Sequence, residues 1–313
     1  LETKNRLLLE SEKQIVERDY LLNMTGSIAK VGGWEYDILS RRIAWTDEVA
    51  RIHGFDPGIE PDVSVIFGLY SADSQQRIRE TLDAATERME PFDLEMDIIT
   101  NSGESKNLRT IGRVISRDGN AVKIQGALQD ITDRRKVETE VGRINRIYSV
   151  ISQINQLIVS TRDAERIFSE SCRIAVDYGK FRMAWIGLID SAQAAVIPAA
   201  WYGFEDGYLS RIKKISVKDV AEGRGPTGTA IREGRYFYCN DILNDPVMAP
   251  WRDEALSRGY RSSIALPVMA NGTPIGAFSI YSSEPDHFNE TEIKLLLEMT
   301  GDIGYAMENI RAR

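Results

Sequence analysis

The stretch that most constrains this chain is 133–160, where aliphatic residues recur at every seventh position. No proline interrupts it, and the single Gly142 costs only about 1 kcal/mol against alanine, so we expect one continuous helix. The stripe is narrow and the rest of the helix is polar, which favours a parallel coiled coil with a second copy of the chain. The alternative is a stripe that lies on its own domain. The predicted seam consists of Val137, Ile144, Ile151 and Ile158, with Ile147 and Ile154 between them.

Length and composition place one domain on each side of this helix. The 313 residues suit two domains of about 100–150 residues each. A net charge of -8 argues against nucleic acid as a partner, because phosphate binding needs clustered Lys and Arg. Two cysteines are too few for a disulfide framework, and no apolar run is long enough to cross a membrane. We therefore expect a cytoplasmic location and no membrane contact by this stretch of chain.

The first half predicts an α+β domain over 25–132, preceded by a coiled-coil type helix over 1–24 with Leu1, Leu8, Ile15 and Leu22 seven apart. Alternation and turn residues predict strands at 34–38, 42–45, 92–100, 107–117 and 121–131. Helical spacing predicts helices at 48–53, 62–70 and 73–89. This order indicates an antiparallel five-stranded sheet with helices on one face.

The second half, 161–311, predicts another antiparallel sheet with helices packed around it. Its predicted strands are 183–189, 195–202, 236–240, 262–269 and 274–281. Its predicted helices are 163–178, 227–233, 251–258 and 289–311. Both halves together predict an α+β fold of two domains, joined and flanked by long helices, with 133–160 as the linking helix.

The first half contains three separated motifs, Gly33–Asp37, Trp45–Pro57 and Gln129–Arg135. In this order they resemble the PAS sensor family with its PAC-type ending. The resemblance implies a last strand that runs directly into a signalling helix through Asp130, Ile131 and Thr132. Physically, Thr132 or Asp133 is expected to cap the first free N–H groups of that helix, and Asp130 to offer its carboxylate to a neighbouring base.

Five segments of the second half carry another resemblance: Phe181–Leu188, Gly225–Ala230, Asn240–Arg252, Tyr260–Val268 and Gly276–Tyr281. They resemble the GAF family. A PAS unit followed by a GAF unit implies the sensory region of a bacterial signalling protein, such as a diguanylate cyclase or sensor histidine kinase, with its output domain further along the chain. The resemblance names neither ligand nor cofactor.

Histidine and glycine patterns exclude several kinds of chemistry. The only histidines, His53 and His287, assemble no Ser/His/Asp set and no metal cluster by spacing. We expect His53 to interact with the end of its helix, with a ligand contact as the alternative. The run Gly223–Gly228 matches the dinucleotide fingerprint by letter, but no buried strand precedes it, which argues against nucleotide binding there.

Aromatic residues give the candidate ligand pockets, with core packing as the alternative for each. The candidates are Trp34, Trp45, Phe55 and Tyr70 in the first half and Trp185, Tyr202, Tyr238 and Trp251 in the second. Cys239 is expected to be a buried apolar residue, and the alternative is a reactive thiol.

These patterns favour a non-enzymatic sensor and relay over two alternatives. In the first reading, a small molecule or partner biases a paired linking helix, which passes the change along the chain. The second reading is a small-molecule enzyme that uses Cys239, or Asp241 with Asp245. The third is a pair of dimerisation spacers that bind nothing.

Overall fold

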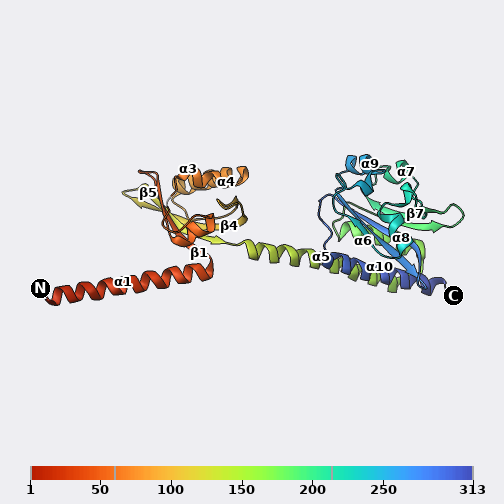
Figure 1. Ribbon diagram of the computed structural model, residues 1–313, viewed down its shortest axis with the longest axis horizontal. Helices are drawn as coiled ribbons and strands as arrows, with labels where there is room; N and C mark the ends of the chain where they lie inside the picture. The colour runs from red at the N-terminus through yellow and green to blue at the C-terminus, as the bar shows by residue number, and fades with distance from the viewer. Residues whose placement is uncertain (1, 60, 213, 312–313) are drawn as a thin grey trace. The chain divides into compact units, whose positions relative to one another are not determined.

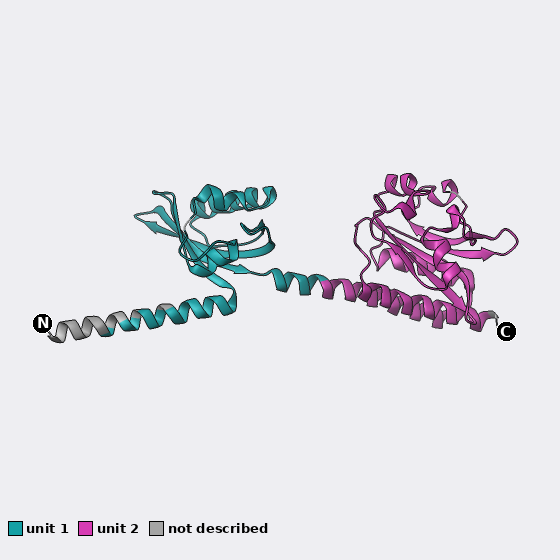
Figure 2. Cartoon of the chain, in the orientation of Figure 1, with its two compact units in different colours: residues 1–139 teal, residues 140–313 magenta. Residues whose placement is uncertain are grey.

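The computed structural model describes residues 2–59, 61–212 and 214–311. The chain divides into two compact units, Leu1–Thr139 and Glu140–Arg313 (Figure 2). The division falls inside α5 (Thr132–Ser160), which is one continuous helix, as the heptad stripe predicts (Figure 1).

Unit 1 is built around an antiparallel sheet in the order β2-β1-β5-β4-β3, which confirms the predicted five-stranded architecture. Its elements are α1 (Glu2–Ala29), β1 (Val31–Asp37), β2 (Arg42–Trp45), α2 (Asp47–His53), α3 (Val63–Gly68), α4 (Ala72–Arg88), β3 (Phe92–Ile99), β4 (Ser105–Arg117) and β5 (Asn120–Asp130). Helices α2, α3 and α4 cover one face, and Val49 and Ile52 of α2 pack on the inward residues of the strands. Gly54 ends α2 in the left-handed conformation that glycine adopts without strain.

The first helix is longer than predicted. It ends at Ala29 instead of residue 24, because Gly26 does not stop the helix, which ends only where Lys30 adopts a positive φ of 52°. Of the predicted stripe on this helix, Leu22 is 62% exposed. Leu1 lies outside the described residues, as do the side chains of Leu8 and Ile15.

Unit 2 contains a second antiparallel sheet, in the order β7-β6-β10-β9-β8. Its elements after α5 are α6 (Ala164–Asp177), β6 (Met183–Asp190), β7 (Ala195–Gly203), α7 (Tyr208–Arg211), α8 (Pro226–Glu233), β8 (Phe237–Cys239), α9 (Arg252–Ser257), β9 (Ser262–Ala270), β10 (Thr273–Ser282) and α10 (Glu290–Arg311). All five predicted strands are present. The one-turn helix α7 was not predicted, because four residues are too few to show a helical period.

Both faces of this second sheet are covered. Helices α5, α6 and α10 pack on the face that carries Phe278 and Ile280. The opposite face, with Trp185 and Tyr281, is covered by α7, α8, α9 and the loops between them. Alternate residues of each strand therefore enter two different cores.

The linking helix corrects part of the predicted seam. Its residues Ile147, Val150, Ile154 and Leu157 are buried in the core of unit 2. Ile151 and Ile158 are half-buried against the same core, and Ile144 is half-buried, whereas Val137 is 62% exposed. From Ile147 onward the stripe thus lies on its own domain, the alternative that the sequence left open. A seven-residue period suits a helix on a globular core as well as a coiled coil, so the period alone does not separate them.

Candidate functional site

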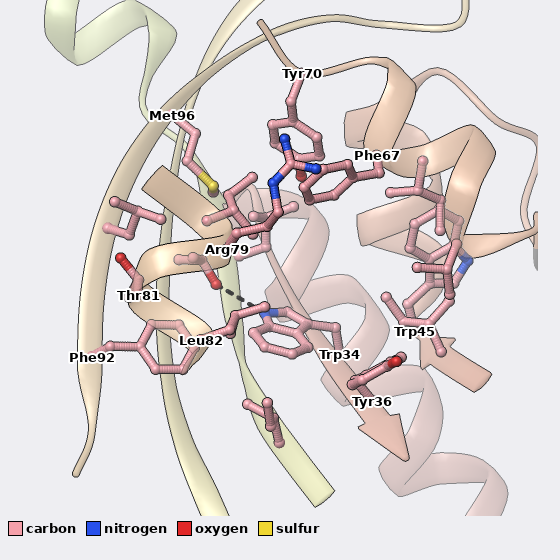
Figure 3. Close-up of a pocket in the computed structure, with 18 of the residues that line it drawn as sticks. Trp34, Tyr36, Trp45, Phe67, Tyr70, Arg79, Thr81, Leu82, Phe92 and Met96 are labelled. Atoms are coloured by element: carbon pink, nitrogen blue, oxygen red, sulfur yellow. Dashed lines mark hydrogen bonds between the residues drawn. The ribbon is translucent and has the colours of Figure 1, made fainter. Parts of the chain in front are cut away.

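A cavity of about 540 Å³ lies in unit 1 between the sheet and helices α2, α3 and α4 (Figure 3). Four of the aromatic and histidine side chains predicted as site residues line it together: Trp34, Trp45, His53 and Tyr70. Phe55 does not line the cavity but packs on Trp45 with the ring centres 6.0 Å apart. The volume falls in the range typical of small-molecule sites.

His53 is fixed inside this wall and is 2% exposed. Its Nδ1 lies 2.9 Å from the carbonyl oxygen of Val49, so Nδ1 carries the proton and donates, and Nε2 accepts from the Tyr70 hydroxyl at 2.9 Å. The Trp45 ring stacks on the imidazole, with the two ring centres 5.1 Å apart. Burial holds the pKa of His53 below its ordinary value, and the nearby charge of Lys106 acts in the same direction. The imidazole is therefore a neutral part of the cavity wall.

Trp34 forms the opposite wall of the cavity. Its indole Nε1 donates to the Thr110 hydroxyl at 3.0 Å, and that hydroxyl donates to the carbonyl oxygen of Ala127 at 3.2 Å. Gly126 lies beside Trp34 on the neighbouring strand, and a Cβ there would approach the indole ring to 2.9 Å. The small residue thus leaves room for the large ring, and the polar atoms of this wall are paired with one another.

Helix α4 supplies the wall that carries charge. Arg79, Asp83 and Glu87 line the cavity at exposed positions, and the Arg79 guanidinium lies 5.0 Å from the centre of the Phe67 ring (Figure 3). Sequence reasoning missed Arg79 and Phe67. The sequence does place a cation next to Ile78 and near Leu82, the apolar residues of this helix that face the sheet. That neighbourhood could have indicated Arg79 as a site residue.

Strand β5 connects the cavity wall to the linking helix α5. Leu128 lines the cavity, and Asp130 ends the same strand. The Asp130 carboxylate accepts from the backbone N–H of Thr132 at 3.0 Å and from its hydroxyl at 2.5 Å, and it lies 3.4 Å from Lys106 Nζ. Burial works to raise the pKa of Asp130, but these hydrogen bonds and the Lys106 charge outweigh it and lower the pKa below its ordinary value. The expected base beside Asp130 is therefore Lys106.

The capping roles at this junction differ from the prediction. Asp130 caps α5, and the Thr132 hydroxyl instead accepts from the backbone N–H of Asn107 in β4 at 3.0 Å. Asp133 pairs with Lys30, just beyond α1, at 2.7 Å. The start of α5 is thus attached to β4, β5 and the end of α1, because short polar side chains here bond across strands in preference to their own helix.

The candidates in unit 2 do not gather around a comparable space. Trp185 and Trp251 are 1% and 4% exposed within the core, while Tyr202 and Tyr238 are 40% and 43% exposed. Where Trp251 faces α8, the cavity measures about 10 Å³. The buried tyrosines Tyr208, Tyr260 and Tyr281 fill this side of the sheet, with ring centres 4.7 to 5.6 Å apart. The two tryptophans are therefore core residues, which is the alternative given for each aromatic candidate.

Cys239 and the neighbouring acids show no arrangement for catalysis. Cys239 is 1% exposed, and burial raises its pKa to about 12, so the reactive thiolate is scarce at neutral pH. Burial also raises the pKa of Cys172. The Asp241 carboxylate accepts from Asn244, and that of Asp245 accepts from the N–H of Val247. Both carboxylates thus stabilise turns.

Comparison with known families agrees with this geometry. A model of the PAS fold matches residues 42–128, and a model of the GAF domain matches residues 161–308. The chain carries a PAS domain followed by a GAF domain. The cavity belongs to the PAS domain, and the filled aromatic core belongs to the GAF domain.

The chain is also similar to curated bacterial proteins. Blue-light-activated histidine kinases of Brucella ovis and Brucella abortus are 26% identical to it over 182 residues, which cover 54% of this chain and 36% of each relative. The matching part therefore spans about a third of the length of those relatives. Together with the PAS and GAF matches, this similarity supports a signal-sensing role for the two domains.

Solved structures with related domains have low overall similarity. Free methionine-R-sulfoxide reductase from Neisseria meningitidis is 20% identical, with a TM-score of 0.45, over 53% of this chain and 90% of its own. A sensory box histidine kinase/response regulator from Burkholderia thailandensis is 21% identical, with a TM-score of 0.34, over 38% of this chain and 91% of its own. Similarity at this level does not indicate a function for this chain.

The glycine-rich loop of the GAF domain is a packing feature. In the described residues between α7 and α8 no strand leads into the loop; the 3-10 turn Ala221–Gly223 leads into α8. A Cβ on Gly223 would lie 2.0 Å from the carbonyl oxygen of Lys218, and one on Gly228 would lie 2.4 Å from that of Gly223. The glycines thus allow close contact between backbone segments. This packing accounts for the match to the dinucleotide fingerprint, and no bound nucleotide is needed to explain it.

A buried ionic cluster holds α5 to α10 within the GAF domain. Arg146 of α5 pairs with Glu292 of α10 at 2.6 Å, and the carboxylate is 1% exposed. Arg146 also lies 3.1 Å from Nε2 of His287, whose Nδ1 lies 3.0 Å from the Ser282 hydroxyl. His287 is 5% exposed, so it is a structural residue of this junction. Sequence reasoning left the cluster unseen because its members are 146 positions apart at most and share no motif.

The described residues contain neither a metal-binding cluster nor a membrane-spanning helix. Within 2–59, 61–212 and 214–311, no group of three or more His, Cys, Asp or Glu side chains is arranged to hold a metal ion. Over the same ranges, no helix combines the length and the apolar character needed to cross a bilayer.

Proposed function

We propose that this chain is a non-catalytic sensory region in which a small molecule in the PAS cavity changes the start of α5. The supporting observation is the continuity of the cavity with that helix: Leu128 faces the cavity, and Asp130 on the same strand caps α5. A ligand that moves Leu128 shifts β5, and the hydrogen bonds of Thr132 pass the shift to the first turn of the helix.

The second step of the proposal is transmission to the GAF domain and beyond. Residues Ile147 to Leu157 of α5 lie in the GAF core, and Arg146 attaches the helix to Glu292 of α10. Movement of α5 therefore acts on α10, which leads to an output domain of the whole cytoplasmic protein. The relatives named histidine kinases, of which the match covers about a third, support an output of that class.

The third step is a parallel homodimer formed by the part of α5 that the GAF core leaves free. Val137, Val141 and Tyr148 are 62%, 49% and 56% exposed. Pairing of these residues with a second copy places two PAS domains on one helical pair, so that both junctions act on the same two-state element.

The cavity and its link to α5 are tested by filling the space. Ile78 lines the cavity from α4, and Ile78→Trp inserts a large ring into it. Ile99→Trp is the matched control, because Ile99 is 62% exposed outside the cavity. We expect the first variant to lose any small molecule that native mass spectrometry detects in the purified wild-type chain, and to change amide hydrogen exchange over 130–141. Unchanged exchange in Ile78→Trp contradicts the relay.

The dimer has its own test. Val141→Lys places a charge in the proposed seam, and Val159→Lys places it at the other end of α5, at a residue that is 89% exposed. Sedimentation should show a dimer for the wild type and the control, with at least tenfold weaker association for Val141→Lys. A wild-type chain that stays monomeric at high concentration rules out the dimeric step.

A further inference from the structure

Two walls of the PAS cavity, the one with Trp34 and the one with His53, offer a ligand no free polar partner. The Trp34 indole N–H, the Thr110 hydroxyl and the Ala127 carbonyl form one closed series, and Val49, His53 and Tyr70 form another. A ligand group that needs a hydrogen bond would have to break one of these pairs, at the cost of an unpaired buried atom. The part of the ligand between the walls is therefore apolar.

Arg79 is the cation of the cavity. In the described parts of the chain it is the only Lys or Arg that lines the space, and no carboxylate pairs with it. Asp83 stands one turn further along α4, where an ion pair between the two would be ordinary, yet the guanidinium lies over the Phe67 ring. Stacking fixes the plane of the guanidinium and leaves its N–H groups available for a planar, bidentate acceptor.

The charges on the same wall limit the ligand further. Asp83 and Glu87 also line the cavity, so one guanidinium is accompanied by two carboxylates. A dianionic phosphoryl group beside Arg79 would be repelled by both, whereas a single carboxylate matches the guanidinium in shape and charge with less repulsion.

From this arrangement we propose that the cavity binds an apolar monocarboxylate, an aromatic or branched aliphatic acid whose carboxylate pairs with Arg79. The proposal rests on the proposed function and names the ligand class for the same cavity. Arg79 then determines specificity: it selects the acid over neutral molecules of the same shape, and its position on α4 ties the ligand to the helix that covers the sheet.

The experiment uses the full chain and three probes that share one ring system: naphthylacetate, its neutral amide naphthylacetamide, and naphthylmethyl phosphate. Titration calorimetry should show the carboxylate binding roughly 10- to 100-fold more tightly than the amide, the range for a hydrogen-bonded charge. The phosphate should bind more weakly than the carboxylate. Arg79→Gln should reduce carboxylate affinity to that of the amide and leave amide affinity within about threefold.

The matched control is Arg77→Gln, an exposed arginine of the same helix that lies outside the cavity, 3.8 Å from Asp73. It should leave all three affinities unchanged. Equal binding of acid and amide, or an unchanged acid preference in Arg79→Gln, overturns the ligand class and leaves the cavity as a site for neutral molecules. Absence of binding by all three probes also overturns it, and the cavity-filling variant Ile78→Trp, which needs no added ligand, decides the proposed function separately.

Discussion

The sheets of the PAS and GAF domains have the same strand order, with the second strand of each at one edge and the third at the other. The PAS sheet encloses about 540 Å³ under α2, α3 and α4, whereas the corresponding GAF space measures about 10 Å³. Small residues such as Thr110 and Gly126 leave room on the PAS face. On the GAF face, Trp185 and three tyrosines fill it. Side-chain volume on one face of a shared topology thus separates a domain with a cavity from a domain with a filled core.

The largest expected effect comes from removing the tryptophan on the first strand of each domain. Trp185→Ala should destabilise the GAF domain by about 3–5 kcal/mol, because it opens a void in a filled core. Trp34→Ala should cost the PAS domain clearly less, because Trp34 is half-buried and already borders empty space. Native-state hydrogen exchange, followed separately in the strands of each domain, gives both values. Equal losses would remove the distinction between cavity and filled core.

The next largest expected effect comes from breaking the ionic cluster around Glu292 in the GAF domain. Glu292→Ala leaves Arg146 without its buried partner and should cost about 3 kcal/mol, at the lower end for a buried pair because Arg146 is 20% exposed. Amide exchange in α5 over 147–158 should accelerate. The control is Glu298→Ala, an exposed position of the same helix. Similar behaviour of both variants would mean that the pair does not hold α5.

The PAS domain should also lose stability at mildly acidic pH through His53. Its pKa is lowered in the folded state, so below about pH 6.5 the unfolded chain binds more protons and stability falls as pH falls. The slope is at most about 1.4 kcal/mol per pH unit. Unfolding of the PAS domain between pH 7 and pH 5 should show this slope in the wild type and a flatter one in His53→Gln. A wild-type profile no steeper than that of the variant would place the imidazole in contact with solvent.

The smallest effect concerns two helix glycines with open space around them. Gly142 lies in the free part of α5, and Gly301 lies in α10; a Cβ at either meets nothing within 4 Å. Each Gly→Ala change should stabilise its helix by up to about 1 kcal/mol. If α5 bends at Gly142 during signalling, only Gly142→Ala should also weaken the response of 130–141 to Ile78→Trp. Equal responses in both alanine variants would exclude Gly142 as the point of bending.

Local chemistry predicted most of the fold. Short-range patterns of apolar, polar and turn residues predicted every strand of both sheets. Only some of the aromatic candidates line the cavity. Trp34 and Trp45 do, while Trp185 and Trp251 are core residues. All four look alike in sequence, because an inward tryptophan fills a core or borders a cavity according to what the opposite layer supplies.

What the sequence by itself determined is the succession of strands and helices, the unbroken linking helix and the sensory class of both domains, since these depend on residues close together in the chain. Only the tertiary structure decided which face of that helix is free, that Asp130 caps it, and that Arg79 lines a cavity with no carboxylate partner among the described residues. Those properties depend on distances between residues far apart in sequence, such as Arg146 and Glu292, and on the volume that packing leaves unfilled.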